Sequence, residues 1–263
     1  MKKYSLGVFL NIFKRDRVDW QRQIEFIRSL RKVEHVEIML EETEIDTKDI
    51  LFLSDNLKNY KIILHAPFMD VALLSLHEEI VQASFKILKK SIQIGSILDA
   101  KLITIHLERY PNAWSERDVV GKSMLWIDRL TKMSPFPFAV ENLSFSGLTQ
   151  IAYPSTKNGI INLMKKLPNS SGLTIDIGHL LKDGTDVFDV LKNTHKSVLN
   201  MHLHDGMKGS AHLRLGDGNL DLDRFFSFLK ESKYDKFVTL EVIGEKEIRD
   251  SWKLAVDYSS RYL

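Results

Sequence analysis

Short apolar runs alternate along the chain with longer segments in which apolar residues recur every three or four positions. Eight runs rich in Val, Ile, Leu and Phe are predicted to form strands, over residues 4–10, 35–40, 61–65, 102–107, 138–141, 173–176, 198–204 and 237–242. Helical periodicity is predicted over residues 18–31, 76–98, 118–132, 157–166, 186–193, 221–230 and 247–258, and more weakly over residues 47–58. This alternation is typical of a parallel sheet covered by helices.

The number and spacing of these units predict an α/β protein with a (β/α)₈ TIM-barrel fold. Eight units in 263 residues leave about 33 residues for each, the usual allowance for such a barrel. A doubly wound sheet is less favoured, because Leu-Asn-Ile-Phe follows the first strand at residues 10–13, where that fold usually has a glycine-rich phosphate loop. The chain has only 6 prolines and no linker-like stretch, so we expect residues 1–263 to form a single domain.

Composition narrows the classes of function. The absence of cysteine excludes disulfides, thiolate metal sites and a cysteine nucleophile. A balance of 37 Lys and Arg against 35 Asp and Glu argues against a dedicated nucleic-acid-binding protein. No apolar run approaches the ~18 residues of a membrane span, and the apolar stretch behind the basic start ends at Leu10, too early for a signal peptide. We therefore expect a cytoplasmic protein without a membrane partner.

From the third strand onward, every predicted strand carries a histidine or a carboxylate at or near its carboxyl end. These residues are His65, His106, Glu141, Asp176, His202, His204 and Glu241. Because the active face of a TIM barrel lies at this end, we expect the side chains to converge. One such residue is usually a satisfied core group, but several buried carboxylates repel one another unless a cation lies among them. Oxygen and nitrogen ligands without sulfur suit manganese, zinc, cobalt or magnesium.

Spacing refines this prediction for two pairs. His202 and His204 lie two residues apart on one strand, so their side chains point the same way at different depths, and only one of them need be a ligand. Asp176 and His179 lie three residues apart where a strand passes into a loop, so His179 is expected to lie nearer the open end of the barrel.

Other ionisable residues are predicted to have no functional role. We expect His35, His77 and His195 to lie at the surface, with His77 nearest to the predicted active face. Glu37 lies inside a strand and can point into the barrel, but a structural role is favoured for it. The same holds for two neighbouring residues predicted to lie in a loop, Glu41 and Glu42.

Several short motifs, in this order, resemble the xylose isomerase-like TIM-barrel superfamily. They are His-Ala-Pro-Phe, Ile-His-Leu-Glu, Val-Glu-Asn, Ile-Asp-Ile-Gly-His, His-Leu-His-Asp-Gly, His-Leu-Arg-Leu-Gly-Asp-Gly-Asn and Leu-Glu-Val. The resemblance extends over about residues 64–241. It implies a metal-dependent enzyme, since that superfamily contains sugar and sugar-phosphate isomerases and epimerases, inosose dehydratases, and abasic-site nucleases of the endonuclease IV type.

The resemblance also implies roles for individual residues. In the ketose-epimerase branch the metal ligands correspond to Glu141, Asp176, His202 and Glu241, and the two glutamates also act as acid and base. His179 and Arg214 correspond to substrate-contacting positions, with His179 also catalytic, and His65 and His204 are further candidates for substrate contact. In the nuclease branch His65 and His106 are additional ligands, Glu141 bridges two metals, and His179 and His212 hold a third ion. That ion also needs an aspartate where this chain has Ser210.

The leading hypothesis is a divalent-metal-dependent sugar or sugar-phosphate isomerase or epimerase that removes a proton next to a carbonyl. It predicts one or two ions, manganese or zinc first, and a small carbohydrate as substrate. The alternative is an endonuclease IV-like phosphodiesterase, which explains His65 and His106 better but not Ser210 or the neutral charge balance. A third reading is a barrel that binds a ligand without turnover, although both candidate acid/base glutamates are in place.

Overall fold

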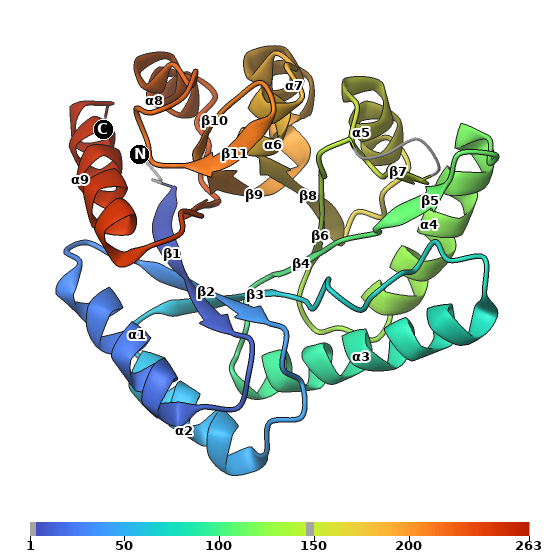
Figure 1. Ribbon diagram of the computed structural model, residues 1–263, viewed down its shortest axis with the longest axis horizontal. Coiled ribbons are helices and arrows are strands. Elements are labelled where there is room, and N and C mark those ends of the chain that lie inside the picture. The colour runs from blue at the N-terminus through green and yellow to red at the C-terminus, as the bar shows by residue number, and fades with distance from the viewer. Residues whose placement is uncertain (1–3, 146–149, 263) are drawn as a thin grey trace.

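In the computed structural model, which describes residues 4–145 and 150–262, eight parallel strands close into a barrel (Figure 1). Its order is β1-β12-β9-β8-β6-β4-β3-β2, and each strand pairs in parallel with both neighbours. The barrel strands are β1 (Ser5–Ile12), β2 (His35–Leu40), β3 (Lys61–His65), β4 (Ile103–Ile105), β6 (Phe138–Glu141), β8 (Ser171–Asp176), β9 (Val198–Leu203) and β12 (Phe237–Leu240). The predicted TIM barrel is confirmed.

Helices surround the barrel in the order in which they follow the strands (Figure 1). The described helices are α1 (Arg17–Ser29), α2 (Thr47–Leu57), α3 (Glu78–Ile97), α4 (Glu116–Thr131), α5 (Lys157–Met164), α6 (Ile177–Lys182), α7 (Val187–Thr194), the 3₁₀ helix η1 (His195–Ser197), α8 (Leu222–Glu231) and α9 (Glu245–Tyr262). The two ends of the described chain lie side by side, since the Tyr4 hydroxyl donates to Ser259 Oγ at 2.7 Å. No helix within residues 4–145 and 150–262 is both long and apolar enough to cross a membrane.

Two short antiparallel sheets and one short helix lie at the carboxyl ends of the barrel strands, where the sequence predicts only loops. One sheet pairs β5 (Arg109–Pro111) with β7 (Gln150–Ala152), which follow two different barrel strands, and the other is a hairpin of β10 (Asp205–Met207) and β11 (Ser210–Leu213). The helix α6 begins directly after β8, and the Asp176 side chain caps it by accepting the His179 N–H at 2.6 Å. These elements enclose the end of the barrel that carries the candidate residues.

The period of two along each strand separates two environments. Alternate residues such as Val36, Ile38 and Leu40 pack outward against the helices in one large apolar cluster. The residues between them face the barrel interior, and they include His35 and Glu37 of β2. Toward the carboxyl ends the interior is polar, as the pairs Thr174/Asp176 and Thr239/Glu241 illustrate.

The prediction that His35 lies at the surface is wrong, because its side chain is completely buried in the amino-terminal half of the barrel. Its ring lies over Gly7 of β1, where an added Cβ would come within 2.5 Å of the imidazole. Ser5 Oγ lies 3.1 Å from His35 Nδ1, and Thr239 Oγ1 lies 2.9 Å from His35 Nε2. Burial, with a smaller contribution from Lys61, lowers the pKa of His35 to about 3, so the ring is neutral. Of the other two histidines predicted at the surface, His77 is exposed and His195 is half-buried.

Candidate metal centre

Six strand ends bring ionisable side chains together at the carboxyl end of the barrel. We call this set the upper cluster, and its members are His65, His106, Glu141, Asp176, His202 and Glu241. Within it, Glu141, Asp176, His202 and Glu241 each offer a ligand atom, and these four atoms lie within 4.8 Å of one another. His65, His106 and Glu141 form a second group that meets the same distance criterion. The convergence expected from the strand ends is therefore present.

Glu141 lies at the centre of the upper cluster, with its side chain only 2% exposed. Its Oε2 atom is 3.1 Å from His65 Nε2, 3.2 Å from His106 Nε2 and 3.3 Å from His202 Nδ1. On the other side of His202, the same Nδ1 atom is 3.1 Å from Glu241 Oε2. The two glutamates thus flank His202, from β6 and from the residue after β12.

The outward-facing nitrogen of each of these three imidazoles lies next to an oxygen acceptor. His65 Nδ1 is 2.8 Å from the Ala66 carbonyl, His106 Nδ1 is 2.9 Å from Glu108 Oε1, and His202 Nε2 is 3.1 Å from Glu37 Oε1. Because each acceptor requires the proton on that outer nitrogen, a neutral ring presents a lone pair on its inner nitrogen. Metal-ligating histidines in proteins show this same arrangement.

Several inner atoms are buried but make no well-aligned hydrogen bond, even where an oppositely charged group lies 3.1–3.3 Å away. Among the described residues these atoms include His106 Nε2, His202 Nδ1, His212 Nδ1 and Glu241 Oε2. Buried polar atoms are almost always hydrogen-bonded, and each unpaired one costs about 1–3 kcal/mol. A divalent cation is the group that nitrogen and carboxylate lone pairs at this spacing would bind, so the donor set fits a metal of the zinc or manganese kind.

The carboxylates of the site also favour protonation of the imidazoles beside them. Burial lowers the pKa of His106, but the carboxylates of Glu141 and Glu108 outweigh it and raise the pKa to about 10. Burial likewise opposes protonation of His202, yet Glu141, Glu37 and Glu241 raise its pKa well above the usual range. Burial would raise the pKa of Glu141, but His202 and His106 lower it by more. Metal ions and protons therefore compete for the same nitrogen atoms.

His204 supports Asp176 from the side facing the β10–β11 hairpin. The backbone N–H of His212 donates to His204 Nδ1 at 2.8 Å, so neutral His204 carries its proton on Nε2 and donates it to Asp176 Oδ2 at 3.0 Å. The ring occupies the space above Gly178, where an added Cβ would lie 1.9 Å from it. Ligand atoms of His204, His212 and Glu241 also lie within 4.8 Å of one another. However, both ring nitrogens of His204 already form hydrogen bonds, to the His212 N–H and to Asp176.

The remaining candidate residues lie nearer to solvent. The His179 side chain is 16% exposed, against 0% for Asp176, as its predicted position requires. His212 Nδ1 lies 4.0 Å from Glu241 Oε1 and its ring is 5.4 Å from that of His179. Arg214 forms a bidentate pair with Asp217, at 2.7 and 2.9 Å, so its charge is directed to that carboxylate. Ser210 begins β11 and brings no carboxylate to this group.

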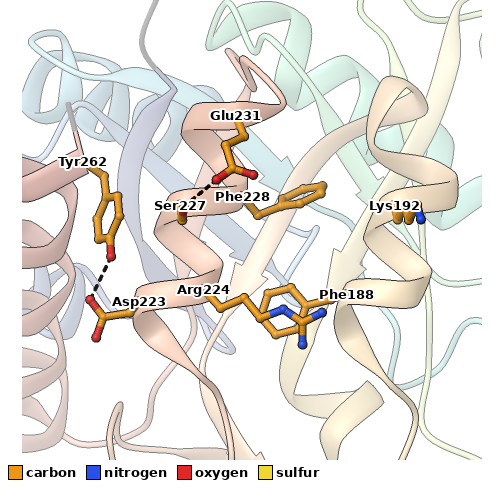
Figure 2. Close-up of a pocket in the computed structure, with 8 residues that line it drawn as sticks. All are labelled: Phe188, Lys192, Asp223, Arg224, Ser227, Phe228, Glu231 and Tyr262. Atoms are coloured by element: carbon orange, nitrogen blue, oxygen red, sulfur yellow. Dashed lines mark hydrogen bonds between the residues drawn. The ribbon is translucent and has the colours of Figure 1, made fainter.

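A separate groove of about 450 Å³ lies on the outside of the barrel between α7 and α8, and none of the strand-end residues lines it. Figure 2 shows how its side chains pair with one another. Tyr262 donates to Asp223 at 2.9 Å, Ser227 donates to Glu231 at 2.8 Å, and the Arg224 guanidinium lies 3.9 Å from the Phe188 ring centroid. These pairings are those of a surface where helices meet, so the groove offers no chemistry comparable to the upper cluster.

The chain as a whole matches a known family. A family model described as a xylose isomerase-like TIM barrel matches residues 22–262. The chain belongs to this family. Among sequence relatives, the uncharacterized protein MJ1311 of Methanocaldococcus jannaschii is 25% identical over 230 residues, which cover 82% of this chain and 76% of that protein.

Solved structures of similar fold include sugar epimerases. A D-tagatose 3-epimerase-like protein has a TM-score of 0.83 and 20% identity, covering 100% of this chain and 98% of the other. A D-allulose 3-epimerase from Methylomonas sp. in complex with D-allulose has a TM-score of 0.79 and 16% identity, again covering 100% and 98%. At these identities the likeness shows that this member of the xylose isomerase-like family shares their fold.

The sequence pattern assigns no role at the site to three residues that contact the upper cluster, and for Glu37 it favours a structural role. Glu108, Asn142 and Glu37 each bond a candidate residue or its backbone, at 2.9 Å to His106, 2.8 Å to the Asp176 N–H and 3.1 Å to His202. Glu108 adopts a left-handed backbone conformation, with φ of 67°, as its side chain contacts the imidazole two residues before it. Strand alternation indicates that Glu37 faces the interior, but it does not indicate which side chain across the barrel it meets.

Proposed function

We propose that this protein is a divalent-metal-dependent isomerase or epimerase that acts on a small sugar, sugar phosphate or related keto-polyol. The observation that carries the proposal is the group Glu141, Asp176, His202 and Glu241, whose ligand atoms lie within 4.8 Å of one another at the open end of the barrel. Two atoms of this group, His202 Nδ1 and Glu241 Oε2, are buried 3.1 Å apart and make no well-aligned hydrogen bond to any residue that the structure describes. The similar fold of a D-allulose 3-epimerase in complex with D-allulose supports a ketose as the substrate class.

These four residues would hold the ion, with manganese or zinc as the first candidates. When bound, a divalent ion supplies Lewis acidity and a template for a carbonyl and a neighbouring hydroxyl oxygen. The glutamates of the site would carry out the proton transfer. One glutamate removes the proton from the carbon next to the carbonyl, and the C–H electron pair passes into an enediolate.

A proton then returns to the same carbon from the opposite face, which epimerises it, or to the neighbouring carbon, which isomerises the sugar. Glu141 and Glu241 flank His202, which suits transfer from two sides of a small substrate. Glu241 is the more open of the two, with its side chain 15% exposed against 2% for Glu141. We therefore assign the first proton transfer to Glu241, because its bound proton can exchange with solvent.

His179 would stabilise negative charge that develops on a substrate oxygen. Its Nδ1 atom lies 3.1 Å from the Asn142 carbonyl, which fixes the ring, and its side chain is 16% exposed at the open end. His65 contacts Glu141 and His204 donates to Asp176, so both would act through these proposed metal ligands. Arg214 would have to release Asp217 before it could bind a hydroxyl or phosphate group of the substrate.

A second candidate is a phosphodiesterase of the endonuclease IV type. The group of His65, His106 and Glu141 favours it, because an epimerase with one metal does not need these two histidines as ligands. Ser210 in place of an aspartate and a net charge of +2 argue against it, since affinity for duplex DNA normally rests on several Lys or Arg contacts to phosphate.

One experiment separates the two candidates. Metal-loaded protein is incubated in deuterated water with a panel of ketoses and ketose phosphates, and separately with an abasic-site oligonucleotide. The proposal predicts deuterium next to the carbonyl of at least one sugar and no strand scission. Efficient scission without deuterium in any sugar would replace the proposed function by the second candidate.

A further inference from the structure

A hydrogen-bonded chain runs through the barrel interior and ends on one of the proposed metal ligands. We call Ser5, His35, Thr239, Glu37 and Asn200 the lower network, and all five side chains are buried. Glu37 is its last member on the side of the upper cluster, where Oε1 lies 3.1 Å from His202 Nε2. We propose that Glu37 is a positioning residue, which fixes the ring orientation and tautomer of His202 so that Nδ1 faces the metal. This inference rests on the proposed metal centre.

The direction of each hydrogen bond follows from the chemistry of its groups. A carboxylate only accepts, so the Thr239 hydroxyl donates to Glu37 Oε2 at 2.6 Å and the Asn200 amide donates to it at 2.8 Å. Because the Thr239 proton is used there, Thr239 Oγ1 accepts from His35 Nε2 at 2.9 Å. His35 Nδ1 then accepts from the Ser5 hydroxyl at 3.1 Å, which matches a neutral ring.

The hydrogen bonds to Glu37 also determine which ring nitrogen of His202 carries the proton when a metal is bound. With Oε2 of Glu37 occupied by two donors, Oε1 accepts from His202, so the proton of the neutral ring lies on Nε2. The lone pair of Nδ1 then faces Glu141 and Glu241, at 3.3 and 3.1 Å. The Phe9 ring packs edge-on against His202 at 5.1 Å between centroids and restricts rotation of the imidazole.

A purely structural role explains Glu37 less well. A fully buried carboxylate is costly, and a neutral side chain of the same size usually serves packing at least as well. A charged Glu37 is explained if it makes His202 a stronger metal ligand. Carboxylates that accept a hydrogen bond from a metal-bound histidine have this effect. Three described donors, one of them His202, bond both oxygens of the Glu37 carboxylate and hold it in place.

The test compares Glu37→Gln with a matched control, Thr104→Val. Thr104 is also completely buried in the barrel interior, and its hydroxyl lies 2.9 Å from that of Thr174, with no bond to the upper cluster among the described contacts. Affinity for Co²⁺ and Zn²⁺ is measured by titration, together with the visible spectrum of the Co²⁺-loaded protein. We expect Glu37→Gln to lower affinity about 10- to 100-fold and to shift the Co²⁺ spectrum, and Glu37→Asp to recover part of the loss.

Thr104→Val should lower stability but keep metal affinity within about twofold, since a buried hydrogen bond contributes about 1 kcal/mol to folding alone. If Glu37→Gln fails to fold, a measurement on the wild type alone tests the inference. Nitrogen-15 spectra of the zinc-loaded wild type should show one ring, assigned to His202, with its proton on Nε2 and its metal on Nδ1. Wild-type affinity in folded Glu37→Gln, or a proton on Nδ1 of His202, would overturn this inference alone. A wild-type protein that binds no metal would overturn the proposed function together with it.

Discussion

The lower network and the upper cluster are built from the same kinds of buried residue, yet they differ in how completely their polar atoms are paired. In the lower network, His35 contacts Ser5 and Thr239, and Glu37 accepts three hydrogen bonds. In the upper cluster, His106 Nε2, His202 Nδ1 and Glu241 Oε2 are buried and make no well-aligned hydrogen bond to any described residue. The polar atoms of the lower network are thus paired with one another, whereas those of the upper cluster keep lone pairs that suit a ligand.

The difference also appears in charge. The lower network contains one carboxylate and a neutral imidazole, whose pKa burial lowers to about 3. The upper cluster contains three carboxylates, from Glu141, Asp176 and Glu241. Against the effect of burial, Glu141 raises the pKa of His106 and of His202, and Glu241 adds to the rise at His202. A polar group in a barrel interior needs no bound ligand when its partners are present, whereas several lone pairs that converge without partners indicate a ligand site.

The largest expected effect comes from the glutamates of the upper cluster. Glu141→Gln and Glu241→Gln each remove a proton acceptor and a charged ligand atom. Turnover in the deuterium assay should fall at least about 10²- to 10⁴-fold, the range for loss of an acid/base group, and metal affinity should fall as well. Glu44→Gln, an exposed glutamate in the loop after β2, should leave both unchanged. Near-normal turnover in either cluster variant would show that the acid/base assignment is wrong.

A substitution of His35, the member of the lower network that makes no contact with the upper cluster among the described residues, should have the opposite signature. His35→Gln leaves the Ser5 or Thr239 hydroxyl without a well-placed partner, so the free energy of unfolding should decrease by about 1–3 kcal/mol. Metal affinity should stay within about threefold of the wild type, because Glu37 keeps its donors Asn200, Thr239 and His202. Denaturant unfolding and metal titration check this, and a loss of metal affinity without a loss of stability would contradict the division between the two regions.

The smallest effect is a dependence of stability on pH that belongs to His35. Burial lowers its pKa to about 3 in the folded protein, while the unfolded chain titrates near pH ~6.5. The stabilising contribution is therefore complete above that pH and is lost as the pH falls toward 3, by roughly 1 kcal/mol for each unit. The stability difference between wild type and His35→Gln should shrink between pH 7 and pH ~4.5, as measured by denaturant unfolding. A difference that stays constant would mean that His35 takes up a proton in the folded protein.

Much of the barrel follows from patterns that are local in the sequence. All eight barrel strands fall within the predicted runs or differ from them by a few residues, because a buried parallel strand needs a continuous apolar run. The candidate residues followed from their position at strand ends, which parallel pairing brings to one face. The ends of the strands are predicted less accurately. The predicted strand 102–107, for example, shortens to Ile103–Ile105, because the chain turns toward His106.

Contacts between distant strands could not be predicted in the same way. The sequence predicts His35 at the surface because it begins a strand, and only its register with Gly7 of β1 reveals the space that the ring fills. Glu37 and His202 are 165 residues apart in the chain, and their contact depends on the closed geometry of the whole barrel. The short helix α6 has too few residues for a period to show, although Asp176 at its start is a typical N-cap.

The central claim is that the upper cluster binds a divalent metal, and titration of metal-free protein tests it most directly. Manganese or zinc is added to the wild type, His35→Gln and Glu141→Gln, while calorimetry counts the ions and thermal unfolding is followed. We predict one or two ions for each wild-type chain. Saturation at a hundredfold excess over Kd should stabilise the fold by about 2.7 kcal/mol, which raises the melting temperature by several degrees. His35→Gln should bind in the same way and Glu141→Gln much more weakly. Wild-type protein that takes up no ion and melts at an unchanged temperature would contradict the account.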